Sequence, residues 1–123
     1  MPHLIRNGAV DPEMQKCIDE CERCHAVCTT TAAYCLQQGG MHAEAEHVGT
    51  LLDCAELCRT SADFMLRGSH FHTNTCAICA EICRRCAESC EKMGDDEVMQ
   101  RCADVCRRCA ESCERMAAMA ASH

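Results

Sequence analysis

Cysteine and other small apolar residues recur every three or four positions along most of the chain, and charged residues fill many of the positions between them. From residue 17 to residue 28 the cysteines are spaced by four, three and four positions, and the same spacing returns in two later segments. A period that alternates between three and four is typical of one face of an α-helix. The pattern therefore predicts a helical chain and favours no strand.

Two of these segments are near copies of each other. Residues 79–93 read CAEICRRCAESCEKM and residues 102–116 read CADVCRRCAESCERM, so 12 of 15 positions are identical. Self-similarity at a fixed period indicates a repeated structural unit, and the 23-residue period here fits one helix and a tight turn. The second half of the chain is therefore expected to hold two equivalent helices.

Helix-breaking residues divide the chain into four segments. Asp11 is a favourable N-cap residue and Pro12 suits the first helical position, while Gly39, Gly68 and Gly94 follow the first, second and third helical segments, where glycine commonly ends a helix. Four helices joined by short turns run antiparallel to their neighbours. The predicted fold class is therefore all-α: an antiparallel up-down four-helix bundle, forming a single domain over residues 1–123. We expect helices at about 12–38, 41–67, 71–93 and 95–119.

A heptad assignment places every cysteine on the side of its helix that faces the core. Only 17 residues are Leu, Ile, Val or Phe and the net charge is −7, a composition that by itself is typical of a disordered chain. Cysteine must therefore supply much of the buried surface. The sixteen predicted core cysteines are Cys17, Cys21, Cys24, Cys28, Cys35, Cys54, Cys58, Cys76, Cys79, Cys83, Cys86, Cys90, Cys102, Cys106, Cys109 and Cys113.

The remaining composition excludes several classes of function. No stretch approaches the roughly 20 apolar residues of a membrane span, and residues 1–12 lack an apolar signal core, so we expect a cytoplasmic protein without a membrane partner. Acidic residues outnumber basic ones by 19 to 12 and aromatic residues are almost absent, which argues against nucleic-acid binding. No thiol stands apart beside a general base, so we do not expect an enzyme.

Sixteen thiols have three conceivable uses. Disulfides between neighbours on one helix would be strained, because their Cβ atoms lie about 5–6 Å apart and a disulfide needs about 3.5–4.5 Å. Packing alone does not explain cysteine at so many core positions, since Leu or Ala would fill them without being open to oxidation. We favour metal binding, in which soft cations compensate the charge of buried thiolates.

Charge and spacing indicate which metal. Cys79 and Cys90 are 11 residues apart, about 16 Å along a helix, so several sites must lie along the bundle axis. Zinc in Cys₄ sites would leave a charge of −2 at each ion, whereas Cu(I) with bridging thiolates reaches neutrality at one ion per thiolate. The C-x₂-C-x₂-C-x₃-C run of many iron–sulfur proteins is absent from the sequence. We therefore predict multiple Cu(I) ions, on the order of 10–20 per chain.

Three motifs carry a resemblance to a known family. They are the repeated Cys-Arg-Arg-Cys-Ala-Glu-Ser-Cys segment, the Cys-x₃-Cys-x₂-Cys-x₃-Cys run at residues 17–28, and Phe64-Met65-x-Arg67-Gly68-Ser69. Over about residues 12–119 the chain resembles the bacterial copper storage proteins, which are copper-binding four-helix bundles. The resemblance implies a lumen filled with Cu(I) bound by cysteine thiolates, a homotetramer, membership of the cytosolic branch, and a role in storing, buffering or detoxifying copper. A copper chaperone or an efflux pump would be a partner.

The resemblance also implies that copper is admitted at one end of the bundle, near histidine and methionine side chains. Relatives often carry histidines between the third and fourth helices, where this chain has Gly94-Asp95-Asp96. Antiparallel threading brings that turn to the same end as the turn between the first two helices, together with Cys35, Cys90 and Cys102. The candidate residues for metal admission at this end are Met41, His42, His47, Met93 and Met99.

Other methionines and histidines receive different assignments. At the opposite end, Met14, Met65 and Met116 are expected to plug the bundle as apolar side chains. His25 falls beside the core-facing stripe and is expected to be a surface or interhelical residue. No role is assigned to His3, His70, His72 and His123.

Two other functions stay open on the sequence alone. A metallothionein-like protein that sequesters zinc or cadmium would saturate near roughly four to six ions per chain, because each ion takes about four thiolates. A thiol redox or metal-sensing regulator would need a surface that contacts DNA or a partner, and the acidic, aromatic-poor sequence offers none. The number of ions bound per chain separates these functions from copper storage.

Overall fold

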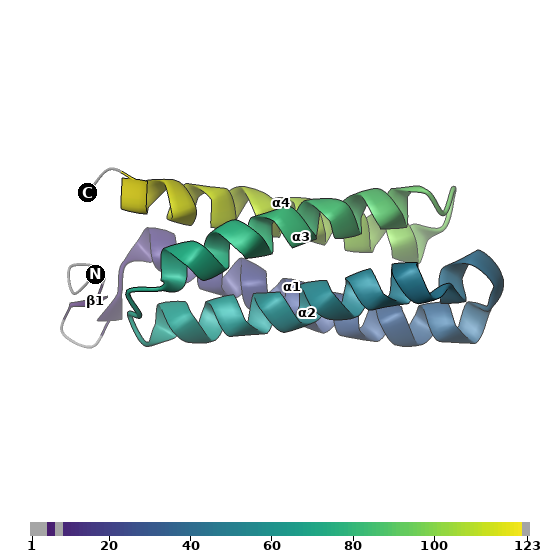
Figure 1. Ribbon diagram of the computed structural model, residues 1–123, viewed down its shortest axis with the longest axis horizontal. Coiled ribbons are helices and arrows are strands. Elements are labelled where there is room, and N and C mark those ends of the chain that lie inside the picture. Colours follow the sequence, from purple (N-terminus) through teal and green to yellow (C-terminus); the bar gives the residue numbers. More distant parts are fainter. Residues whose placement is uncertain (1–4, 7–8, 122–123) are drawn as a thin grey trace.

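The computed structural model describes residues 5–6 and 9–121 and consists of four long helices preceded by a short strand pair. The helices run up and down along a common axis (Figure 1). His3, His123 and part of the N-terminal segment considered above lie outside the described residues. The elements are β1 (Ile5–Arg6), β2 (Ala9–Val10), α1 (Pro12–Gln38), the 3₁₀ helix η2 (Gly40–Ala43), α2 (Ala45–Leu66), α3 (His72–Glu91) and α4 (Glu97–Ala121).

The first helix begins and ends where the sequence predicts. The Asp11 carboxylate accepts a hydrogen bond of 3.1 Å from the backbone N–H of Glu13, and Pro12 occupies the first turn. At the other end Gly39 has a φ of 71°, and its N–H donates to the Cys35 carbonyl at 3.3 Å. Glycine adopts this left-handed conformation without the steric cost of a Cβ atom, so it ends the helix.

The second helix begins four residues later than predicted. Residues 40–43 form η2 in place of the first turn of α2, and Glu44 is extended before α2 starts at Ala45. Gly40 also has a positive φ of 57°, so the chain uses two glycines and a 3₁₀ turn to cross from α1 to α2. The other helix ends differ from the predicted ones by one or two residues.

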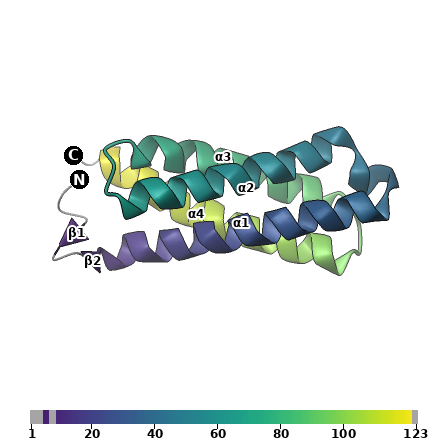
Figure 2. The ribbon, with the colours of Figure 1, turned by 90° about the horizontal axis from the view of Figure 1, so that it is seen from below.

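The strand pair was not predicted. β1 and β2 pair antiparallel, with Ile5 opposite Val10 and Arg6 opposite Ala9, just before α1 (Figure 2). Strands of two residues are too short to show an alternating pattern in the sequence.

The four helices form the predicted antiparallel bundle. α1 packs against α2 and α4, and α3 packs against the same two helices. The strand pair, the C-terminal end of α4 and the α2–α3 turn lie at one end of the bundle, whereas η2 and the α3–α4 turn lie at the other (Figures 1 and 2). No helix in the described part of the chain is both long enough and apolar enough to cross a membrane.

Cysteine lines the bundle core, as predicted. All sixteen cysteines are free thiols and each is at most 1% exposed. Small residues such as Ala55, Ala80 and Ala103 are buried beside them, and Ile18 and Leu51 are among the few large aliphatic side chains in the core. No Lys, Arg, Asp or Glu side chain is buried among the residues for which burial is described. The core therefore holds many thiols and no charged side chain to balance a thiolate.

Candidate metal centre

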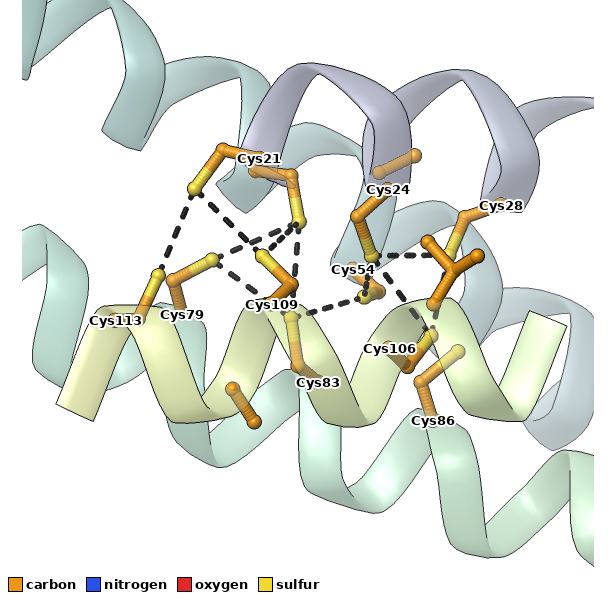
Figure 3. Close-up of a cluster of buried hydrophobic side chains, with 14 of the residues drawn as sticks. Cys21, Cys24, Cys28, Cys54, Cys79, Cys83, Cys86, Cys106, Cys109 and Cys113 are labelled. Carbon is orange, nitrogen blue, oxygen red and sulfur yellow. Dashed lines mark hydrogen bonds between the residues drawn. The ribbon is translucent and has the colours of Figure 1, made fainter. Parts of the chain in front are cut away.

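The sulfur atoms of the four helices meet along the bundle axis (Figure 3). The Sγ of Cys21 lies 3.6 Å from those of Cys109 and Cys113, and the Sγ of Cys58 lies 3.6 Å from that of Cys79. A disulfide needs an S–S distance of about 2.0 Å. Two thiolates bound to one metal at about 2.3 Å in tetrahedral geometry lie about 3.8 Å apart. The observed spacing therefore suits sulfur atoms that share a cation.

The thiols form a continuous row. Five groups within the described residues have all their sulfur atoms within 4.8 Å of one another, and consecutive groups share members such as Cys24 and Cys109. Cys35 and Cys90 belong to none of these groups. In order from the end that holds the α2–α3 turn, the groups are Cys17, Cys76 and Cys113; Cys21, Cys79, Cys109 and Cys113; Cys24, Cys58, Cys83 and Cys109; Cys24, Cys28, Cys54 and Cys106; and Cys28, Cys86, Cys102 and Cys106.

The thiols influence one another's ionisation. The neighbouring thiols of Cys113 and Cys17, followed by burial, raise the pKa of Cys76 well above its ordinary value. Burial, followed by the charges of nearby groups, raises the pKa of Cys35 to about 11. Hydrogen bonds from neighbouring thiols lower the pKa of Cys54 instead. Because several thiols hold their protons at neutral pH, a cation that binds them must displace those protons.

Beyond the row, Cys35 lies beside a histidine and a methionine. The Nε2 of His47 is 3.4 Å from the Cys35 Sγ, and the Sδ of Met99 is 3.8 Å from the same atom. The Nδ1 of His47 lies 2.6 Å from the Oγ of Ser89, which orients the ring. Burial, followed by the charge of His42, lowers the pKa of His47. A neutral imidazole of this kind has a lone pair to offer a metal.

A hollow of about 270 Å³ opens beside His47, between the start of α2 and the end of α3. Met41 and Met93 both line it, and Met41 is 58% exposed. Glu44 and Lys92 are among the charged residues at its walls. The hollow therefore connects solvent with His47, and it is flanked by two thioether groups that suit a soft cation.

His42 is turned toward Asp96 rather than toward this hollow. Its Nε2 lies 3.0 Å from the Oδ2 of Asp96, and the Tyr34 hydroxyl donates to the same oxygen at 2.7 Å. The Oδ1 of Asp96 accepts hydrogen bonds from the backbone N–H groups of Val98 and Met99. The Tyr34 hydrogen bond is the largest of the contacts that hold the pKa of Asp96 below its usual range. Asp96 thus ties α1, η2 and the start of α4 together.

The structure places the other histidines and methionines as follows. Met14, Met65 and Met116 are fully buried in the core, as side chains that plug the bundle would be. The Nδ1 of His25 lies 2.8 Å from the Ala55 carbonyl oxygen, so His25 bridges α1 and α2. His72, which received no role, is buried at the start of α3.

Two contacts in this region were missed by the sequence analysis. Ser89 orients His47, and Tyr34 binds Asp96 across 62 positions of the chain. Ser89 belongs to the repeated Cys-Ala-Glu-Ser-Cys segment and is partly buried, and its copy in α4, Ser112, is buried. The repeat therefore drew attention to both serines without indicating that only Ser89 faces a histidine.

Comparison with known proteins settles the family. A family model described as "Copper storage protein" matches residues 10–118. The chain belongs to the copper storage protein family. The resemblance inferred from the cysteine motifs is therefore confirmed, and a metallothionein-like protein is not favoured.

Solved structures of similar proteins agree with this assignment. The chain is 46% identical to the Nmul_A1745 protein from Nitrosospira multiformis, with 89% of this chain and 99% of that chain covered and a TM-score of 0.84. It is 32% identical to the Cu(I)-bound copper storage protein BsCsp3 of Bacillus subtilis, with 85% and 98% covered and a TM-score of 0.79. It is 28% identical to the copper storage protein Ccsp from Streptomyces lividans, loaded with 10 copper equivalents, with 88% and 86% covered and a TM-score of 0.76.

Proposed function

We propose that this protein stores Cu(I) in its core, where all sixteen cysteines act as thiolate ligands and hold more than about ten ions per chain. The observation that carries the proposal is the continuous row of five thiol groups in a core without a buried charged side chain among the described residues. Within the described part of the chain, no buried Lys or Arg side chain is available to balance a thiolate formed there. Bound metal must therefore supply the positive charge.

Charge balance favours Cu(I) over Zn(II) as the stored ion. A zinc ion in a four-thiolate group leaves a net charge of −2, and the groups here share members and lie next to one another. Several such charges in one narrow core would repel one another and would be costly to bury. Cu(I) accepts two or three thiolates and shares them with its neighbours, so the filled row approaches neutrality. Two similar proteins are described in copper-bound form.

Copper would enter this core through the hollow beside His47. Met41 and Met93 would receive the ion at the wall of the hollow, and His47 would pass it to Cys35, 3.4 Å away. Met99, in contact with Cys35, would complete this first site inside the bundle. His42 would have a supporting role, because Asp96 already holds it.

The cellular setting follows from the family. We infer a cytoplasmic, non-enzymatic protein that receives copper from a chaperone or passes it to an efflux pump, and one similar protein is described as a cytosolic copper storage protein. We also infer a homotetramer. Several large apolar side chains, among them Leu36 and Phe71, are more than half exposed and would be covered by contacts between bundles.

An anaerobic titration of the fully reduced protein with Cu(I), in competition with a chelator, tests the proposed function. We expect saturation above about ten ions per chain, because each buried thiolate needs roughly one positive charge. A parallel titration with Zn(II) is the control. Saturation at about four Cu(I) ions or fewer, with Zn(II) bound to the same extent, would indicate discrete tetrahedral zinc sites and would contradict the proposal.

A further inference from the structure

Ser61 is a buried hydroxyl residue on the core-facing side of α2. Its side chain is completely buried, and its Oγ has no hydrogen-bond partner within the described part of the chain. Cys58, one turn earlier on α2, faces the core and contacts other sulfur atoms. Nearly all buried polar groups in folded proteins are hydrogen-bonded, so an unpaired hydroxyl at a core position requires an explanation.

The register of the bundle places Ser61 beside the three-thiol group at the end of the row. The Sγ of Cys58 lies 3.6 Å from that of Cys79 and 3.7 Å from that of Cys109. Ser61 lies one helical turn further along α2. One turn toward the same end of the bundle, Cys76 follows Cys79 on α3 and Cys113 follows Cys109 on α4. Ser61 therefore lies on α2 near the level where α1, α3 and α4 contribute Cys17, Cys76 and Cys113, and neither this group nor the adjoining group of Cys21, Cys79, Cys109 and Cys113 has a member from α2.

The chemistry at this level changes when a metal binds. A neutral thiol is a weak hydrogen-bond acceptor, so the apoprotein offers Ser61 little. When a cation binds, the thiol protons leave to water and the sulfur atoms become anionic acceptors, to which a hydroxyl donates a stronger, charge-assisted hydrogen bond. The hydroxyl oxygen is a hard donor that a soft cation does not prefer as a ligand. Ser61 is therefore suited to support bound thiolates and not to coordinate the ion.

We propose that Ser61 is a positioning residue for a terminal site formed by Cys17, Cys76 and Cys113, where its hydroxyl donates a hydrogen bond to a metal-bound thiolate. This inference rests on the proposed storage of Cu(I). The hydrogen bond exists only in the loaded protein, so the hydroxyl is unfavourable in the apoprotein and favourable once copper is bound. This makes the terminal level different from the four-thiol groups, which consist of cysteine alone.

Ser61→Ala tests the proposal through two opposite effects. The reduced apoprotein should become more stable to urea, because the unpaired hydroxyl is removed. In the loaded variant, a competing chelator should remove up to three ions per chain at a concentration about 10- to 100-fold lower than the wild-type protein requires. A change of this size is the effect of one charge-assisted hydrogen bond. The matched control is Ser112→Ala, because the Ser112 Oγ accepts a hydrogen bond from Arg115 in the structure and its loss should not stabilise the apoprotein.

Two further variants show whether the effect passes through the three thiols. In a Cys76→Ala background, Ser61→Ala should no longer change copper retention, because the terminal site is already broken. Ser61→Cys should raise the ion count by about one per chain, since it adds a thiolate to the same level. The proposal would be overturned if Ser61→Ala destabilised the apoprotein or left copper retention unchanged. It would also be overturned if the effect of Ser61→Ala persisted without Cys76, or if Ser61→Cys added no ion. Failure of the wild-type protein to take up more than about ten Cu(I) ions would instead overturn the storage function.

Discussion

Cys24 and Cys109 are predicted to matter more for copper capacity than a pair of cysteines outside the row. Each belongs to two four-thiol groups and they share one of them, so replacing both interrupts three of the five groups. Cys35 and Cys90 belong to no group. The variants Cys24→Ala/Cys109→Ala and Cys35→Ala/Cys90→Ala each remove two fully buried thiols, so they form a matched pair.

The expected losses follow from the contacts. Charge balance alone predicts that each variant binds about two Cu(I) ions fewer. The variant without Cys35 and Cys90 should lose no more than this, because neither thiol belongs to any of the five groups and each group keeps all its sulfur atoms when they are removed. The central variant should lose more than two ions. The Cys24 Sγ lies 3.8 Å from each of three other sulfur atoms, and all three lose a partner with which to share a cation.

Both variants should remain folded, so that the ion counts can be compared. Replacing a buried cysteine with alanine leaves a small cavity and no unpaired hydroxyl. The cavity lowers the free energy of unfolding by about 1 kcal/mol per site if the loss of a sulfur atom resembles the loss of a methyl group. Circular dichroism and urea unfolding of the reduced apoproteins check this. Cu(I) titration against a chelator then gives the capacity. Equal losses in the two variants would refute the idea that shared thiols organise the row.

Three further predictions concern the apoprotein and the loading reaction. Asp96→Ala removes the cap of α4 and the contacts to Tyr34 and His42, and should lower the free energy of unfolding by about 1–2 kcal/mol; an unshifted urea curve contradicts this. Because the pKa of Cys35 is raised from 9.0 to about 11 in the folded state, apoprotein stability should be retained below pH 9 and fall as the pH rises toward 11; a constant melting temperature over this range contradicts this. Copper loading should release protons, measured by pH-stat titration, and loading without proton release would show that protonated thiols are not the ligands.

The bundle could be predicted because the cysteine spacing determines which face of each helix is buried. Asp11 and Gly39 likewise determine where α1 begins and ends, through a side-chain hydrogen bond and a positive φ. The start of α2 was predicted wrongly because Gly39 and Gly40 show that the chain turns without showing how many residues the turn uses. In this chain the turn includes the whole of η2.

The site was predictable at the level of residue types and faces. Periodicity places Cys24 and Cys54 in the core, but their 3.8 Å contact depends on how far α1 and α2 are shifted along each other. Such a shift is set by turn geometry and packing, which leave no periodic pattern in the sequence. The same reason explains why the contact between His47 and Ser89 was missed.

Anomalous diffraction at the copper edge from crystals of the Cu(I)-loaded protein tests the central claim most directly. The account predicts a row of copper peaks along the bundle axis, from the level of Cys17, Cys76 and Cys113 to that of Cys28, Cys86, Cys102 and Cys106, each within bonding distance of cysteine sulfur. Copper confined to the histidine and methionine side chains at the hollow, or bound outside the bundle with the core thiols still protonated, would contradict it.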